Sequence, residues 1–269
     1  MKNLLKYNGK IYSQDDLIEA LIRLGIQKGD IICSHSEIYG FGIPLLPIKD
    51  FLNALLECLF EVIGKEGTLI MPTFTYSFCK NEVYDKLNSK CTVGALNEFF
   101  RKQQGVKRTN DPIFSFAVKG THEELFLNKE QKSCFDENCV YAILTRNNGK
   151  ILNFGNKDCF TFIHYPEEVC QISYRYNKNF QGFIIDENGK KYEKNINYFV
   201  RKENLLPDDN KIFNYLIQNK QYNYLNFASG TIGVFNCLES FKSFIEIFKH
   251  NDNIFLTNKS LTILGIKNQ

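Results

Sequence analysis

Long apolar runs, paired cysteines and a marked charge excess are all missing from this 269-residue sequence. No segment approaches the roughly 18 consecutive apolar residues that a membrane-spanning helix needs, and residues 1–7 lack the apolar core of a secretion signal. None of the nine cysteines forms a Cys-x-x-Cys pair, so we expect neither a zinc ribbon nor a disulfide framework. These absences predict a cytoplasmic protein with reduced thiols, no metal and no membrane contact.

The charge balance excludes a further class of function. The 33 basic and 30 acidic residues leave a formal net charge of +3, and the isoelectric point is about 8.3. This is too mild for a nucleic-acid-binding protein. Neither a Walker phosphate loop nor a GxGxxG fingerprint occurs, so the sequence does not support nucleotide hydrolysis or dinucleotide binding. With 43% hydrophobic and 23% charged residues, the chain has the composition of an ordinary globular protein.

Segments with strand and helix patterns alternate along the first 155 residues. Ser13 and Asp16 have the spacing of a capping box before a helix with one apolar face, which we expect to end at Gly25. Thr121 and Glu124 have the same spacing and predict a second, short helix. The other expected helices cover residues 51–63, 94–104 and 140–146, and the expected strands cover residues 30–34, 68–71, 115–118 and 150–154. This alternation predicts an α/β fold, with a mixed sheet covered by helices on both faces.

The pattern changes after residue 175. Residues 180–185 and 191–200 have the composition of strands, and Asn188-Gly189 between them is typical of a hairpin turn. Helical stretches near residues 211–219 and 238–248 follow, with short strand-like segments between and after them. We therefore expect one domain over residues 1–269, with a β-hairpin inserted at about residues 175–202.

The first candidate site lies at the end of a predicted strand. Cys33-Ser34-His35-Ser36 closes this strand and precedes the glycine-rich Gly40-Phe41-Gly42. In open α/β sheets, ligands bind outside the carboxyl ends of strands, and small residues there let backbone N–H groups approach an anion or an amide. A simple glycine-rich turn with a capping serine has the same pattern, so both interpretations stay open.

Thr161, His164 and Glu167 form the second candidate site. They are spaced by three and share one face where the segment is helical. A carboxylate beside an imidazole fixes its tautomer and raises its basicity, which suits a general base. The alternative is a histidine at a helix start, with Glu167 stabilising the helix dipole. Pro166 predicts that the helix begins at Tyr165 or Pro166, which would alter the shared face.

Two basic segments are further candidates. Arg108, in the turn before a predicted strand, suits a phosphate, and Ser115 suits an amide; a solvated basic turn is the simpler interpretation. Residues 175–202 carry seven basic and three acidic side chains, with aromatic residues between them. Such a hairpin suits a nucleotide, with charge for its phosphates and rings for its base, or it is a solvated surface.

Five segments, in this order, resemble the aminoglycoside 3-N-acetyltransferase (antibiotic N-acetyltransferase) family. They are residues 29–36, 67–73, 108–120 and 149–155 and the motif Thr161-x-x-His164-x-x-Glu167. The resemblance covers roughly residues 13–240. It implies an α/β fold of the antibiotic N-acetyltransferase type, distinct from the GNAT acetyltransferases. It also implies acetyl-CoA as the donor and an amine on a sugar as the acceptor. We further expect a monomer or a homodimer.

The resemblance implies roles for individual residues. His164 is then the base that takes the proton from the amine, Glu167 orients it, and Thr161 with backbone N–H groups stabilises the oxyanion. The residues implied to bind CoA are Ser34, His35, Ser36, Thr73, Arg108 and Ser115. The chain departs from the family at Asp111, where a histidine is usual, so the role of that position is open.

The net charge bears on the acceptor. Aminoglycoside-modifying members of this family are typically acidic, as polycationic drugs demand, whereas this chain is slightly basic. Complementarity of charge therefore favours an anionic acceptor, and we expect a nucleotide-linked amino sugar of the kind used for surface polysaccharides. Aminoglycoside resistance is the alternative. Two others are a covalent enzyme that uses Cys33 or Cys159, and a CoA- or sugar-nucleotide-binding protein without activity.

Overall fold

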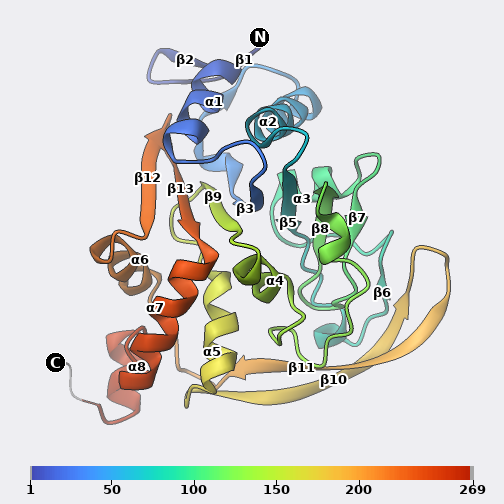
Figure 1. The fold of residues 1–269 in the computed structure, drawn as a ribbon, viewed down its shortest axis with the longest axis vertical. Helices are drawn as coiled ribbons and strands as arrows, with labels where there is room; N and C mark the ends of the chain where they lie inside the picture. The colour runs from blue at the N-terminus through green and yellow to red at the C-terminus, as the bar shows by residue number, and fades with distance from the viewer. Residues whose placement is uncertain (1, 267–269) are drawn as a thin grey trace.

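A seven-stranded mixed sheet forms the centre of the computed structural model, which describes residues 2–266 (Figure 1). Its middle strand, β3 (Ile31–Ser36), runs parallel to β5 (Thr68–Pro72) on one side and to β9 (Lys150–Gly155) on the other. The outer strands pair antiparallel and are β8 (Phe116–Gly120), β7 (Lys107–Arg108), β13 (Gly230–Asn236) and β12 (Tyr222–Phe227). The predicted mixed α/β sheet is therefore confirmed, in the order β12-β13-β9-β3-β5-β8-β7.

Two apolar layers cover this sheet, one on each face. Side chains alternate along each strand, so Ile31 and Cys33 belong to one buried cluster while Ile32 belongs to the other. The Ile32 cluster includes residues of α1 (Gln14–Arg23), α2 (Ile48–Ile63) and α3 (Ala95–Arg101). The Ile31 cluster includes residues of α4 (Val140–Arg146), α5 (His164–Cys170), α6 (Asp209–Gln218) and α7 (Cys237–His250).

Local signals set the ends of several helices as the sequence predicts. The Ser13 side chain accepts from the Asp16 backbone, and the Asp16 side chain accepts from the Ser13 backbone at 2.7 Å, so the capping box of α1 is confirmed. Gly64 ends α2 with φ +66°, a conformation that side chains rarely adopt. A small N-terminal sheet of β1 (Asn3–Tyr7), β2 (Lys10–Ser13) and β4 (Ile43–Pro44) was not predicted.

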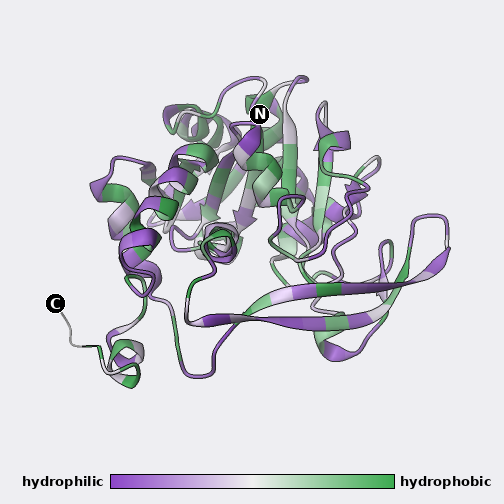
Figure 2. Cartoon of the chain, turned by 60° about the horizontal axis from the view of Figure 1, so that its bottom comes forward, coloured by the Kyte–Doolittle hydropathy of each residue, from purple (hydrophilic) through white to green (hydrophobic). Residues whose placement is uncertain are grey.

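The late hairpin is present within the predicted residues 175–202, and its strands are longer than predicted. β10 (Arg175–Ile185) and β11 (Lys191–Arg201) pair in regular antiparallel register, and β6 (Tyr84–Asp85) joins them near their tip. The Asp186 side chain accepts from the backbone N–H groups of Asn188 and Lys190, which closes the turn. The pair runs along the bottom of the molecule in Figure 1 and curves upward outside β6, and Figure 2 shows both strands mainly hydrophilic with short hydrophobic stretches.

Two local predictions are wrong. Thr121 does not cap a helix, because its hydroxyl donates to the Lys65 carbonyl, and the turn that follows is the single 3₁₀ turn η3 (Glu123–Leu125). The segment after α7 is not strand-like, since it forms α8 (Asn258–Ile263), which Thr257 caps through the Ser260 N–H. In both places tertiary contacts or a stronger cap decide the local structure.

Candidate active site

A cavity of about 350 Å³ lies where the parallel strands end. Because β3, β5 and β9 are parallel, their carboxyl ends meet at one edge of the sheet, and the residues after them converge there. Gly155, at φ +105°, permits this convergence, since a Cβ there would collide with the Glu37 carbonyl oxygen. We call this the first cavity; its lining includes His35, Ser36, Tyr39, Pro72, Phe74, Gly94, Asn97, Asn156, Cys159 and Thr161.

A second cavity of about 600 Å³ adjoins the first. Its wall is formed by the segment before α5, by the open end of the β10–β11 hairpin and by the residues that lead to α6. Cys159 and Thr161 line both cavities. These two side chains therefore belong to the walls of both cavities.

The predicted pair of His164 and Glu167 is present, and the His164 imidazole lines the second cavity. The 3₁₀ turn η4 (Thr161–Ile163) leads directly into α5, which begins at His164 itself. Pro166 lies in the first turn of α5, where a missing N–H costs no helical hydrogen bond, so the spacing of the pair is preserved. His164 Nδ1 lies 2.6 Å from Glu167 Oε2, and the His164 ring lines the cavity.

Glu167 is the centre of a buried network that the sequence did not reveal. Its side chain is 1% exposed, accepts from the Tyr174 hydroxyl at 2.5 Å and forms an ion pair with Arg175 Nε at 2.8 Å. Burial acts to raise the pKa of Glu167, but its interactions with the His164 imidazole and the Arg175 guanidinium outweigh it and hold the pKa below its ordinary value. Arg175 drew attention only as part of the basic hairpin, and no spacing rule links it to Glu167.

Burial and the neighbouring Arg175 favour the neutral form of His164. Burial lowers the pKa of His164, and the charge of Arg175, whose guanidinium lies 3.0 Å from Nδ1, lowers it further against the opposing effect of Glu167. At the shorter distance of 2.6 Å, Nδ1–H donates to Glu167, and the lone pair is then on Nε2. The arrangement is that of a neutral imidazole able to take a proton in the cavity.

The predicted loop at the end of β3 contributes to the first cavity in part. His35 and Ser36 line it, whereas Ser34 is fully buried behind them and shares a hydrogen bond with Ser36 at 3.1 Å. His35 is held on both ring nitrogens: the Tyr141 hydroxyl lies 3.1 Å from Nε2, and the Cys159 sulfur lies 3.3 Å from Nδ1.

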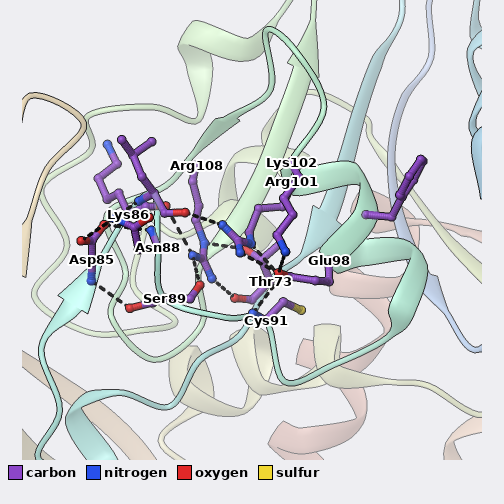
Figure 3. Close-up of polar contacts among 12 residues, drawn as sticks. Thr73, Asp85, Lys86, Asn88, Ser89, Cys91, Glu98, Arg101, Lys102 and Arg108 are labelled. Atoms are coloured by element: carbon purple, nitrogen blue, oxygen red, sulfur yellow. Dashed lines mark hydrogen bonds and ion pairs between the residues drawn. The ribbon is translucent and has the colours of Figure 1, made fainter. Parts of the chain in front are cut away.

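Arg108, Thr73 and Ser115 form a buried cluster next to the cavity wall at Pro72 and Phe74. Figure 3 shows Arg108 with Thr73. Arg108 Nε lies 3.0 Å from the Thr73 hydroxyl and 3.2 Å from the Ser115 hydroxyl. Its terminal nitrogens donate to the carbonyls of Thr73 and Ser89, both at 2.6 Å. None of the three lines the first cavity, so their contact with the donor stays a prediction. Their placement favours a structural role, in which they support the cavity wall at Pro72.

The contacts of Asp111 indicate a role in the local structure of the chain. It is buried, and its Oδ1 accepts from the backbone N–H groups of Ile113 and Phe114, both at 2.8 Å. Burial raises the pKa of Asp111 to about 6 despite these hydrogen bonds. The carboxylate thus shapes the turn that leads to β8.

Most of the basic side chains of the hairpin lie away from the second cavity. The cavity is lined by Arg175, Arg201 and Lys202 at the open end of the hairpin, together with the acidic Asp158, Glu203 and Asp209. Strands of eleven residues place the tip roughly 30 Å from this end. The remaining basic side chains of the hairpin, which are Lys178, Lys190, Lys191 and Lys194, are not part of the lining. The charges around this cavity are therefore balanced.

Residues 2–266 contain no helix with the length and apolar character needed to cross a bilayer. The same part of the chain holds no group of three or more His, Cys, Asp and Glu side chains placed to bind a metal ion.

The family model described as aminoglycoside 3-N-acetyltransferase matches residues 35–248. Aminoglycoside N(3)-acetyltransferase IV of Salmonella sp. is 27% identical over 163 residues, which span 59% of this chain and 60% of that enzyme. The SPbeta prophage-derived aminoglycoside N(3')-acetyltransferase-like protein YokD of Bacillus subtilis (strain 168) is 23% identical over an alignment that covers 98% of this chain and 99% of YokD.

Solved structures share the fold. The structure of AAC-IIIb in binary complex with CoASH superposes with a TM-score of 0.76 at 19% identity, covering 89% of this chain and 97% of that one. A histidine-to-alanine mutant of aminoglycoside acetyltransferase AAC(3)-IVa in complex with a gentamicin gives a TM-score of 0.78 at 19% identity, covering 99% of this chain and 96% of that one.

Proposed function

The chain belongs to the aminoglycoside 3-N-acetyltransferase family of acetyl-CoA-dependent transferases, and on this premise we propose that it acetylates an amine of an amino-sugar acceptor with His164 as the base. The observation that carries the proposal is the His164–Glu167–Arg175 network beside the second cavity. That cavity meets the first one at Cys159 and Thr161, so a donor and an acceptor in adjoining cavities bring their reacting ends together there.

The first cavity suits the pantetheine arm of acetyl-CoA. Asn97 is buried in its wall and donates to the Pro72 carbonyl at 2.8 Å, while its Oδ1 has no partner among the described residues. An unpaired buried acceptor is costly, and the amide N–H groups of pantetheine are donors that would satisfy it. Ser36 supplies a hydroxyl to the same wall. Acetyl-CoA supplies the activated acyl thioester; the groups that hold it and move the proton belong to the chain.

The roles of the reacting side chains follow from their placement. The neutral His164 takes the proton from the amine as nitrogen attacks the thioester carbonyl. Glu167 holds the imidazole and stabilises the imidazolium that forms. Thr161, at the junction of the cavities, supplies a hydroxyl for the developing oxyanion. Collapse of the tetrahedral intermediate then expels the thiolate of CoA.

For the acceptor, we propose an aminoglycoside-like polyamine. Asp158, Glu203 and Asp209 line the second cavity, and Asp158 Oδ1 has no partner within residues 2–266. Arg175 is already paired with Glu167, so its charge is not free to repel a cation. The names of the relatives and the gentamicin-bound neighbour support the same acceptor class. A nucleotide-linked amino sugar for polysaccharide synthesis is the second candidate, favoured by Arg201 and Lys202 at the same cavity.

Steady-state kinetics with both acceptor classes at two ionic strengths tests the choice. Each exposed charge contact contributes up to about 1 kcal/mol, so Asp209→Asn should lower kcat/KM for an aminoglycoside about fivefold at low salt and less at high salt. Lys202→Gln is the matched control and should leave that value unchanged or raise it. A nucleotide-linked amino sugar that reacts faster than every aminoglycoside, and loses rate in Lys202→Gln, would promote the second candidate.

A further inference from the structure

A third cavity, of about 260 Å³, lies apart from the two cavities described above and shares no lining residue with either of them. Its wall comes from the C-terminal end of α3, from β7 and from the segment after β6, and the hairpin turn reaches it at Glu187. Its lining contains more basic than acidic side chains, with Lys86, Arg101, Lys107 and Arg108 against Glu124 and Glu187. The proposed acetyl transfer makes no use of this cluster.

Three of these basic side chains are buried and keep donors without a partner. Lys86 and Arg108 are 5% exposed, and the Arg101 side chain is 6% exposed. Each terminal nitrogen of an arginine carries two N–H groups, and an ammonium carries three. Within residues 2–266, Nη2 of Arg108 donates only to the Thr73 carbonyl, and Nη1 and Nη2 of Arg101 donate to one acceptor each. Lys86 Nζ has only the Glu187 carboxylate there. Buried donors without acceptors are costly, and a group with several anionic oxygens would satisfy all three side chains.

Arg108 is also a buried cation without a carboxylate. Its acceptors in the described part of the chain are hydroxyls and backbone carbonyls, whereas Arg101 has an ion pair with Glu98 at 2.7 Å. Burial acts to lower the pKa of Arg108, and the positive charge of Arg101 acts in the same direction. The guanidinium stays charged all the same, since arginine is not deprotonated in proteins. Because buried charges are stable when they are paired, an anion beside Arg108 would be strongly favoured.

We propose that the third cavity binds the phosphate group of a small phosphomonoester through Lys86, Arg101 and Arg108, which Figure 3 shows in one cluster of polar contacts. At pH 7 such a phosphate carries about −1.5 to −2 charges and three acceptor oxygens, which match the positive charge and the unused donors of the wall. Three apolar side chains also line the cavity, and these are Leu87, Val106 and Leu127. An apolar or aromatic part of the ligand therefore packs beside the phosphate. The site is independent of the acetyl transfer proposed above.

Glu187, in the turn of the hairpin, competes with the phosphate for Lys86. Its carboxylate lies 2.6 Å from Lys86 Nζ, and its side chain is 47% exposed. A partly exposed ion pair contributes little to stability, so a phosphate displaces this carboxylate at small cost and takes its place on the ammonium. The backbone keeps the turn in position, because β6 pairs with β10 and the Lys86 N–H donates to the Ile185 carbonyl at 3.0 Å. The Glu187 carboxylate thus stands where the anion would bind.

Isothermal titration calorimetry with phenyl phosphate tests the proposal, with phenol as the neutral probe. The wild type should bind one phenyl phosphate with a Kd of about 1 mM or below, and no phenol. Lys86→Gln and Glu187→Gln break the same ion pair, but they should change this affinity in opposite directions. Lys86→Gln should lower it at least about tenfold, and Glu187→Gln should raise it about fivefold, because a competing charge is gone. Lys190→Gln and Glu193→Gln, at exposed positions of the same hairpin outside the cavity, are the matched controls and should stay within about twofold.

CoA also carries a phosphomonoester, at its 3′ position, so CoA and dephospho-CoA distinguish the two sources of the phosphate. Phenyl phosphate should bind unchanged to protein saturated with CoA, and Lys86→Gln should bind CoA as the wild type does. A loss of CoA affinity in Lys86→Gln that is absent with dephospho-CoA would overturn the separate site. The proposal also fails if phenyl phosphate does not bind at about ten times the stated concentration, or if both variants change the affinity in the same direction. Because Glu187 is half exposed, Glu187→Gln decides even where Lys86→Gln fails to fold.

Discussion

Replacement of Glu167 by glutamine is the sharpest test of the buried network. The substitution preserves the shape of the side chain and removes its charge, which leaves the Arg175 guanidinium buried without a carboxylate. The loss of one partner of a buried ion pair costs about 3–5 kcal/mol. The free energy of unfolding of a globular protein is about 5–15 kcal/mol, so the variant loses a large share of its stability. A loss of about 3 kcal/mol corresponds to a fall in Tm of roughly 6–12 °C.

Glu168→Gln is the matched control, one residue along the same helix. Glu168 has no ion pair among the described residues, and its Oε2 has no hydrogen-bond partner there. Burial raises the pKa of Glu168 to about 7, so near neutral pH its carboxyl is already partly protonated. Its replacement should therefore cost less than about 1 kcal/mol. Urea denaturation followed by circular dichroism measures both variants.

The pH dependence has a definite sign. The folded protein lowers the pKa of Glu167 from its ordinary value of 4.5. The ionised carboxylate therefore contributes fully to the free energy of unfolding above pH 4.5. This contribution is lost as the pH falls from 4.5 through the pKa of the folded state. The stability gap between wild type and Glu167→Gln should therefore be full at pH 7 and shrink in acid. The double variant Glu167→Gln with Arg175→Gln should recover part of the loss, since no unpaired charge remains. Equal losses for Glu167→Gln and Glu168→Gln would refute the reasoning.

Three further predictions concern the site. His164→Asn should lower kcat about 10²–10⁴-fold, the usual effect of losing a general base, and leave CoA affinity measured by calorimetry unchanged; near wild-type turnover with a true acceptor would contradict the assignment. The acid limb of the kcat/KM profile should have its midpoint below pH 6.5, because the pKa of His164 is lowered from that value, so a midpoint above 6.5 is the contrary result. Ser36→Trp should abolish CoA binding by filling the first cavity while the fold survives, whereas Thr121→Val, at a surface turn away from both cavities, should bind CoA normally.

Much of the local structure was predictable, because the interactions that specify it join residues close in sequence. The capping box at Ser13, the end of α2 at Gly64 and the hairpin turn at Gly189 each depend on a few neighbouring residues. The contact between His164 and Glu167 belongs to the same class, since it spans one helical turn. Thr121 shows the limit of such signals, because a distant carbonyl at Lys65 competes for the same hydroxyl.

The sequence by itself determined the alternation of strands and helices, the family motifs and the spacing of the His164–Glu167 pair. Only the tertiary structure decided that Arg175 pairs with Glu167, that Arg108 is buried rather than open to the first cavity, and that Cys159 lies against His35. It also decided that most of the basic charge of the hairpin lies away from the second cavity. The composition gives the number of charged residues but not where they lie. The contact of Glu167 with Arg175 spans 8 positions of the sequence, and that of His35 with Cys159 spans 124. Both depend on which strands pair and on where the ends of the strands meet.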